Sequence, residues 1–498
     1  MYVSTRGATA RLTAAQAIAQ GIAPDGGLFV PAAIPAIDGL FMDSLVPLTY
    51  QQRAAAVLGL FLTDYSKAEI DTCVAGAYGS GKFTAAAVAP VVKVTEGTFA
   101  LELWHGPTSA FKDMALQLLP RLLVCALQKN GEKAQIVILV ATSGDTGKAA
   151  LEGFKDVEQT QVIVFYPEDG VSRIQRLQMV TQEGENLKVI AVQGNFDDAQ
   201  TGVKQIFNDE AYNAALADQG CKLSSANSIN WGRLVPQIVY YFSAYADLVK
   251  DKHIQQGTPV NFVVPTGNFG NILAGYYAKQ MGLPINKLIC ASNSNNVLTD
   301  FLTTGLYNRN RQFHKTFSPS MDILISSNLE RLLYHLTGGD TGQVNQWMTE
   351  LNTTGQYKIA DEYAAAIRAM FPAAWVSDEA TAATISQVYK EHNYPLDPHT
   401  AVAWRVAENY RHSSGDTTPT VIVSTASPFK FNETVLAALT GSDSLDGKNE
   451  FIALQELAGL INRPVPPALA ELELKPVRHT VVCAKQDMPA VVTAQLCR

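Results

Sequence analysis

Six short apolar runs, separated by longer segments of helical periodicity, constrain the fold of this chain more than any other feature. The runs span residues 136–140, 162–165, 189–192, 260–264, 288–290 and 421–423. Uninterrupted runs of β-branched and aliphatic residues suit strands that are buried on both faces, as in parallel sheets covered by helices. The alternation of such runs with helical segments predicts an α/β fold with more than one sheet.

The composition is that of a large globular protein with a sizeable core. The chain has 498 residues, of which 47% are hydrophobic and 17% charged, so disorder is not expected. A net charge of −8 argues against nucleic acid as the main partner. The six cysteines are scattered without metal-ligand spacing, which predicts no metal site and favours reduced thiols in the cytoplasm. We find neither a secretory signal nor an apolar stretch long enough to span a membrane.

Three of the predicted strands end in loops rich in Gly, Ser, Thr and Asn. These loops are Thr142-Ser-Gly-Asp-Thr-Gly147, Pro265-Thr-Gly-Asn-Phe-Gly-Asn271 and Ser424-Thr-Ala-Ser-Pro-Phe-Lys-Phe431. Ligands of open α/β sheets bind at the carboxyl ends of strands. Free N–H groups at a helix start suit a carboxylate in the first loop and a phosphate in the second. Each loop could also serve only as an N-cap, Thr425 included. The spacings depart from those of nucleotide-binding loops.

Lys112 stands after a Gly-Pro turn and an aromatic residue, in His105-Gly-Pro-Thr-Ser-Ala-Phe-Lys-Asp113, where an amphipathic helix is predicted to begin. Apolar neighbours would desolvate its amine, lower its pKa and expose the neutral nucleophile. Such an amine forms Schiff bases with carbonyl compounds, pyridoxal phosphate (PLP) among them. A solvated lysine is the ordinary alternative.

Taken together, these segments resemble the threonine synthase family, PLP enzymes of fold type II. The resemblance also includes Asn227-Ser-Ile-Asn-Trp-Gly-Arg233 and Ser318-Pro-Ser-Met-Asp-Ile323. It implies two parallel-sheet α/β domains with the cofactor in the cleft between them, and a helical N-terminal segment. We assign residues 1–95 to that segment, 96–130 with 240–498 to a large PLP-binding domain, and 131–239 to a small domain.

The resemblance implies a role for each matching position. Lys112 corresponds to the Schiff-base lysine and proton shuttle. Positions implied to bind the cofactor are Gly267, Asn268, Phe269, Gly270 and Asn271 around its phosphate, Thr425 beside its pyridine nitrogen, and Asp145 near its 3′-oxygen. Positions implied to bind the substrate are Ser143 and Thr146 for the carboxylate, and Asn227, Ser228 and Arg233 for the phosphate.

The implied reaction converts O-phospho-L-homoserine and water to L-threonine and phosphate, in a monomer or homodimer. Two positions depart from the family pattern: Ser427 replaces a histidine, and Lys148 stands where a small residue is common. A related fold-type-II lyase and a catalytically inactive homologue are the alternatives. The segment 227–233 argues against the first, and the filled catalytic positions argue against the second.

Overall fold

The computed structural model describes residues 1–8, 10–79, 81–142, 144–168 and 171–496. The N-terminal segment begins with an antiparallel strand pair, β1 (Tyr2–Ser4) and β2 (Phe29–Pro31), and is otherwise helical. Its helices are α1 (Ala14–Gln20), α2 (Gly39–Leu45), α3 (Tyr50–Phe61) and α4 (Lys67–Tyr78). Helices α1, α3 and α4 each start at a capping box, in which a Ser or Thr and a Gln or Glu three residues later satisfy each other's backbone N–H groups.

The larger sheet has six strands in the order β13-β10-β9-β14-β4-β3. All neighbours are parallel except the β3–β4 hairpin at one edge. The strands are β3 (Val91–Thr95), β4 (Thr98–Glu102), β9 (Val260–Pro265), β10 (Ile285–Ser292), β13 (Ala373–Trp375) and β14 (Thr420–Ser424).

The smaller sheet has five strands, all parallel, in the order β15-β7-β6-β5-β8. They are β5 (Gln135–Ala141), β6 (Thr160–Pro167), β7 (Leu187–Gln193), β8 (Cys221–Ser224) and β15 (Val481–Ala484). Strand β15 pairs with β7, so the end of the chain does not lie with the larger sheet, in contrast to the assignment of the whole range 240–498 to the large domain.

Helices cover both faces of the two sheets. Those that follow strands β5 to β7 and β15 of the smaller sheet are α7 (Asp145–Phe154), α8 (Arg173–Val180), α9 (Phe196–Asn208), α10 (Glu210–Asp218) and α22 (Met488–Leu496). The others are α5 (Lys112–Leu116), α6 (Leu119–Lys129), α11 (Trp231–Lys250), α12 (Gly270–Met281), α13 (Val297–Thr304), α14 (Leu329–Leu336), α15 (Thr341–Thr354), α16 (Asp361–Met370), α17 (Asp378–His392), α18 (Pro398–Ser414), α19 (Asn432–Thr440), α20 (Glu450–Ile461) and α21 (Pro467–Ala470). None of the helices among the described residues combines the length and apolar character that crossing a membrane requires.

The remaining short elements are a strand pair and five 3-10 turns. They are β11 (Leu306–Asn308) with β12 (Gln356–Lys358), η1 (Pro319–Met321), η2 (Pro428–Phe431), η3 (Ser442–Leu445), η4 (Leu472–Leu474) and η5 (Lys485–Asp487).

Alternation of side chains explains the continuous apolar runs of the strands. In β14, Val421 and Val423 join the central core, whereas Ile422 joins the core beneath α17 to α20. In β6, Val162 and Val164 likewise face the central core, and Ile163 faces α9 and α22. Both faces of these strands are therefore buried, as predicted for parallel strands. The predicted α/β fold class is confirmed.

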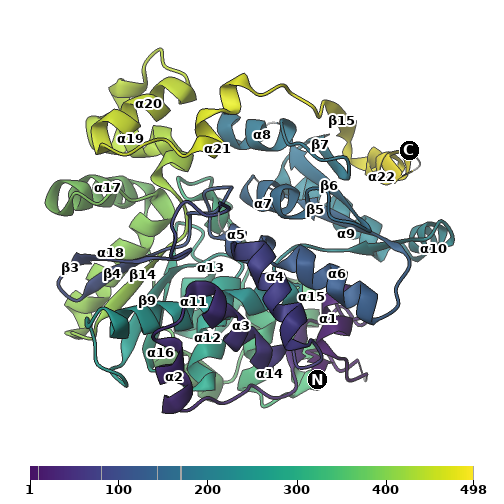
Figure 1. Ribbon diagram of the computed structural model, residues 1–498, viewed down its shortest axis with the longest axis horizontal. Helices are drawn as coiled ribbons and strands as arrows, with labels where there is room; N and C mark the ends of the chain where they lie inside the picture. The colour runs from purple at the N-terminus through teal and green to yellow at the C-terminus, as the bar shows by residue number, and fades with distance from the viewer. Residues whose placement is uncertain (9, 80, 143, 169–170, 497–498) are drawn as a thin grey trace.

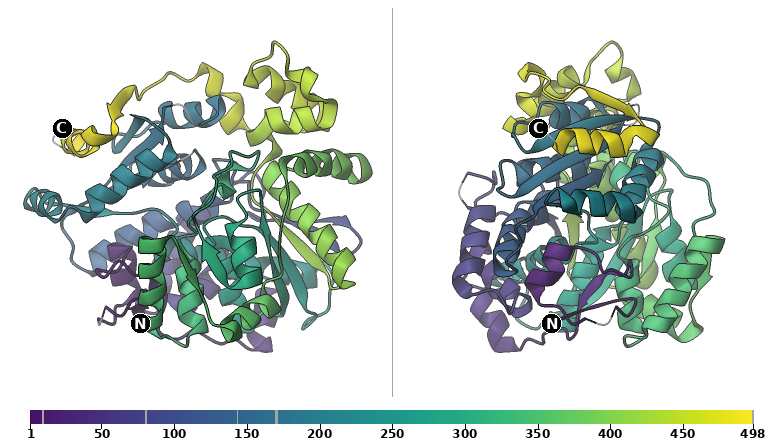
Figure 2. Two further views of the ribbon diagram at one scale, coloured as in Figure 1. Left: turned by 180° about the vertical axis from the view of Figure 1, so that it is seen from behind. Right: turned by 90° about the vertical axis from the view of Figure 1, so that its right-hand side faces the viewer.

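The two sheets lie side by side (Figures 1 and 2). Helix α5 lies between them, as its label in Figure 1 shows. Helix α11 is almost completely buried and leads from β8 of the smaller sheet to β9 of the larger one. Strands β4, β5, β8, β9 and β14 each pass from their carboxyl end into a loop and then a helix or 3-10 turn. Residues from these loops meet between the sheets, where the candidate site is built.

Candidate active site

The amine of Lys112 is buried at the first residue of α5. Phe111 N–H donates to Thr425 O at 2.8 Å, and Ala110 forms a bridge with Ala426. The segment before Lys112 is thus fastened to the segment after β14. Burial lowers the pKa of Lys112 to about 8, because removal of water penalises the charged amine. The predicted position of Lys112 at a helix start and its lowered pKa are both confirmed.

Asp145 lies on the other side of this amine, at the first residue of α7. Its Oδ2 is 3.5 Å from Lys112 Nζ, and its Oδ1 is 2.9 Å from Lys430 Nζ. Gln175 Nε2 also donates to Oδ1, at 3.0 Å. Burial alone would raise the pKa of Asp145, but Lys430 and Lys112 hold it well below its ordinary value. The carboxylate is therefore ionised, and it joins the smaller sheet to groups from the larger one.

Lys430 completes this cluster, although sequence reasoning gave it no role. Its side chain is fully buried in η2, and its Nζ also donates to Thr108 O at 2.9 Å. One sequence signal could have identified Lys430: it lies within Ser-Pro-Phe-Lys, just after the carboxyl end of a predicted buried strand. A second group that sequence reasoning missed is Ser320, whose hydroxyl contacts both Lys112 and Asp145.

The loop 267–271 connects β9 to α12 and passes close to the backbone of η1. A Cβ atom on Gly267 would lie 2.9 Å from Ser320 O and 3.1 Å from Met321 Cα, so only glycine fits. Phe269 adopts a left-handed backbone with φ of +63°. Gly270 begins the helix, so the free N–H groups of its first turn face the loop, as in anion sites.

Asn271 carries an unsatisfied donor at the start of α12. The hydroxyls of Tyr240 and Tyr241 donate to its Oδ1 at 2.6 and 2.9 Å. Its Nδ2 is buried and has no hydrogen-bond partner among the described residues. A buried donor without a partner is costly, and a phosphate oxygen would satisfy it. A desolvated amine together with this loop fits a phosphorylated aldehyde such as PLP.

The loop after β5 is partly closed by its own hydroxyl. Thr142 Oγ1 accepts hydrogen bonds from the N–H groups of Gly144 and Gly147, each at 2.9 Å. Ser143 lies outside the described residues. Thr146 is half-buried in the first turn of α7, with its hydroxyl unbonded among the described residues.

Lys148 turns to Glu152 and Gln182, so this departure from the family pattern does not add a charge beside Lys112.

Arg233 is buried near the start of α11. Its NH1 donates to Ala226 O at 2.7 Å, and no carboxylate among the described residues forms an ion pair with it. Burial lowers the pKa of Arg233 to about 10, and its charge lowers the pKa of Lys112. The guanidinium therefore lies near the amine of Lys112, and it has the capacity to bind an anion.

The segment 227–233 and the glycine loop are adjacent. Asn328 Nδ2 donates to Ser228 Oγ at 2.9 Å and to Asn268 O at 3.1 Å. Asn227 is half-buried at the start of the same segment, and its N–H donates to Ser225 Oγ. The two predicted phosphate sites are therefore neighbours joined by one amide side chain.

Thr425 is buried immediately after β14 and does not cap the turn that follows it. The cap of η2 is Ser427, whose Oγ accepts from Phe429 N–H at 3.3 Å. The alternative that Thr425 serves only as an N-cap is therefore wrong, and Ser427 has a local structural role. The hydroxyl of Thr425 has no hydrogen-bond partner within the part of the chain that the structure describes, so it is free for a ligand.

Similarity to known proteins agrees with this geometry. Residues 85–426 match the family model described as pyridoxal-phosphate dependent enzyme. The solved structure of PLP-bound threonine synthase from Brucella melitensis is 38% identical, with a TM-score of 0.87 and 99% of both chains covered. The fold and site thus define a PLP-dependent enzyme of fold type II.

Matches to family models at the two ends of the chain identify its family. Residues 1–78 match the model for the threonine synthase N terminus, and residues 400–493 match the model for the threonine synthase C-terminal region. Threonine synthase from Pseudomonas aeruginosa is 41% identical over 88% of this chain and 90% of its own length. The chain belongs to the threonine synthase family.

A human relative, threonine synthase-like 1, is 43% identical over 85% of this chain. The match covers 58% of that protein's length, so this chain spans less than two thirds of it.

Proposed function

We propose that this chain converts O-phospho-L-homoserine and water to L-threonine and phosphate. Beyond the family, the observation that carries the proposal is Arg233. A buried guanidinium with no carboxylate partner is costly unless an anion binds it, and this one lies near the buried amine of Lys112. The substrate needs both an amine that reacts at its amino-acid end and a cation for its phosphate.

We infer that Lys112 holds the cofactor covalently and that residues Gly267, Asn268, Phe269, Gly270 and Asn271 bind its phosphate. Thr425, whose hydroxyl has no partner among the described residues, would face the pyridine nitrogen, and Asp145 would lie near the 3′-oxygen. When bound, PLP supplies an electron sink for negative charge on the substrate's α-carbon.

The chain's own residues then bind the substrate and move its protons. Lys112 is neutral in a large fraction of molecules near pH 8, so its amine can take a proton from the substrate and return it. Arg233, Asn227 and Ser228 bind the leaving phosphate. Ser143, Thr146 and the remaining free N–H groups of α7 bind the carboxylate. A hydroxyl at Thr425 can donate to an unprotonated ring nitrogen but cannot stabilise a protonated one as a carboxylate does.

The test is the stoichiometry of products from O-phosphohomoserine. Threonine and inorganic phosphate in equal amounts support the proposal. Phosphate accompanied by a 2-oxo acid and ammonia would indicate the related lyase, and no turnover of this substrate by PLP-loaded protein would indicate an inactive homologue.

We further propose that the enzyme acts in the cytoplasm as a monomer or homodimer. The dispersed cysteines support a reducing compartment. Sedimentation at micromolar concentration would separate the two assembly states, and cell fractionation tests the compartment. The domain division at residues 95, 130 and 239 also remains a proposal, with residues 481–496 counted with the smaller domain; limited proteolysis would test these boundaries.

A further inference from the structure

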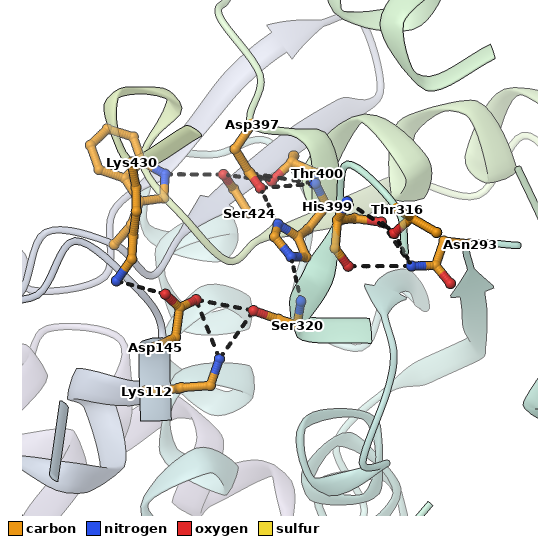
Figure 3. A network of polar contacts seen from close by, with 12 residues as sticks. Lys112, Asp145, Asn293, Thr316, Ser320, Asp397, His399, Thr400, Ser424 and Lys430 are labelled. Atoms are coloured by element: carbon orange, nitrogen blue, oxygen red, sulfur yellow. Dashed lines mark hydrogen bonds and ion pairs between the residues drawn. The ribbon is translucent and has the colours of Figure 1, made fainter. Parts of the chain in front are cut away.

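The hydroxyl of Ser320 bridges the two charged groups at the centre of the site. Ser320 Oγ donates to Asp145 Oδ2 at 3.0 Å and accepts from Lys112 Nζ at 3.3 Å. Figure 3 shows the resulting triangle of Lys112, Asp145 and Ser320. Because Asp145 is an ionised acceptor, the serine proton points to it, and a lone pair of the serine oxygen faces the amine.

This arrangement orients the nucleophile. A neutral amine has two N–H groups and one lone pair. If one N–H is directed to Ser320 and the other to Asp145, the lone pair points away from both. Without Ser320 the amine could rotate about its last carbon–nitrogen bond, and fewer molecules would present the lone pair in the reactive direction.

His399 holds Ser320 through its backbone. Its Nε2 accepts a hydrogen bond from Ser320 N–H at 3.1 Å, and its Nδ1 lies 2.8 Å from Asp397 Oδ1. An amide N–H can only donate and an ionised carboxylate can only accept. Both contacts are satisfied only by a neutral ring that carries its proton on Nδ1.

Asp397 fixes this tautomer because it is itself held in place as the N-cap of α18. Its carboxylate accepts the backbone N–H groups of His399 and Thr400 and the Thr400 hydroxyl. Asp397 and His399 are both almost completely buried. The residue types Ser, His and Asp resemble those of hydrolytic triads, but here the imidazole contacts the serine backbone. It therefore does not activate the hydroxyl as a nucleophile.

We propose that Ser320 is a further catalytic residue, which orients the Lys112 amine through its hydroxyl, and that His399 and Asp397 are positioning residues that hold Ser320 by its amide. The inference rests on the proposed function only in taking Lys112 as the reacting amine.

The test compares Ser320→Ala with wild-type enzyme in two measurements. One is steady-state turnover; the other is the rate at which cofactor-depleted protein regains its visible absorbance when PLP is added. We expect kcat to fall about 10- to 100-fold, the effect of one lost hydrogen bond to a charged group, with KM changed less than about threefold. We expect the return of absorbance to slow about tenfold or more. Ser320→Thr, which keeps a hydroxyl, should retain most of both rates.

The matched control is Ser318→Ala. Ser318 is a buried serine of the same loop that accepts a hydrogen bond from Asn293 Nδ2 at 3.0 Å. If this variant matched Ser320→Ala in both measurements, loop packing would explain the effect and the proposal would be overturned. An unchanged return of absorbance in Ser320→Ala would overturn it too.

The role of His399 is tested by a pair of substitutions. The side-chain carbonyl of His399→Gln can still accept the Ser320 N–H, whereas His399→Leu cannot. We expect His399→Leu to slow both rates and His399→Gln to recover most of the loss. In the Ser320→Ala background, His399→Leu should lower each rate by less than about a further threefold. Both substitutions remove the same orientation of the Lys112 amine, so their effects should not multiply. Effects that multiply instead would show that His399 acts elsewhere. If wild-type enzyme formed no threonine, the proposed function would fail, while the absorbance measurement would still report on Ser320.

Discussion

Asp145 lies closer to Lys430 than to Lys112: its Oδ1 is 2.9 Å from Lys430 Nζ, whereas its Oδ2 is 3.5 Å from Lys112 Nζ. The carboxylate is thus neutralised mainly by a lysine that is fully buried and has no other charge partner among the described residues. Burial, together with the charges of Arg233 and Lys430, outweighs the effect of Asp145 and lowers the pKa of Lys112 to about 8. The ion pair also joins a helix of the smaller sheet to the turn after β14 of the larger one.

Removal of Lys430 should destabilise the fold and restore charge to Lys112. Lys430→Met leaves Lys112 as the remaining lysine beside the buried Asp145 carboxylate, and breaking a buried ion pair costs up to about 3–5 kcal/mol. Urea unfolding measures the loss of stability. The pH midpoint for chemical labelling of the Lys112 amine should shift above about 8. The double variant Lys430→Met/Asp145→Leu should recover part of the stability. Equal or greater loss in the double variant would contradict the pairing.

Replacement of Lys112 by alanine should abolish turnover and leave the fold intact, because the change removes the amine and its proton transfer. Product formation and the melting temperature of the holoprotein check this. The matched control is Lys67→Ala, since Lys67 is largely exposed and pairs with Asp71 in α4. Activity of even a tenth of the wild-type rate in Lys112→Ala would exclude Lys112 as the reacting amine.

Stability should depend on pH through Lys112 in the cofactor-free protein. Its pKa is about 8 in the folded chain, below its ordinary value of 10.5. At pH 7 both the folded and unfolded states carry the charge, which the folded site disfavours, so Lys112→Met should unfold at higher urea concentration than wild type. Between about pH 8 and 10.5 the unfolded state binds more protons, so wild type gains stability with pH and the difference shrinks. A difference that stayed constant or grew over this range would contradict the lowered pKa.

Arg233→Leu should weaken substrate binding far more than cofactor retention. A charge-assisted hydrogen bond contributes roughly 1.5–3 kcal/mol, so KM for O-phosphohomoserine should rise about ten- to hundredfold. Inorganic phosphate should raise the melting temperature of wild type but not of the variant, and Arg233→Lys should keep part of the response. Loss of PLP with unchanged KM would mean that the two phosphate sites had been exchanged.

Thr425→Asp should change the product ratio. A carboxylate beside the pyridine nitrogen favours its protonation, which strengthens the electron sink and redistributes the reactions that follow. Threonine per phosphate should fall below one, and Thr425→Ser should keep the ratio. Since Ser427 rather than Thr425 caps η2, helix capping does not confound the result. An unchanged ratio, rate and absorption spectrum would remove Thr425 from the catalytic residues.

Much of the fold and part of the site follow from local sequence patterns. The six apolar runs lie in β5, β6, β7, β9, β10 and β14, because a strand buried on both faces needs an unbroken run. Lys112 begins a helix, as its Gly-Pro turn and amphipathic continuation predicted. Glycines at positions 267 and 270 indicated that the backbone of this loop can wrap closely around a ligand. The family was indicated by several motifs of several residues each.

Partners far apart in the chain were decided only by tertiary structure. Lys112 and Ser320 are 208 residues apart, and Arg173 N–H donates to Glu450 across 277 residues. No periodicity predicts that β15 adds to the edge beside β7, because an edge strand of four residues has no pattern of its own. Lys430, Ser320 and His399 are unremarkable as residues in sequence. Lys430 follows β14 of the larger sheet, whereas Ser320 lies in η1 and His399 at the start of α18. They acquire roles because tertiary packing brings these three segments to one place, and burial there makes each unpaired charge or donor costly.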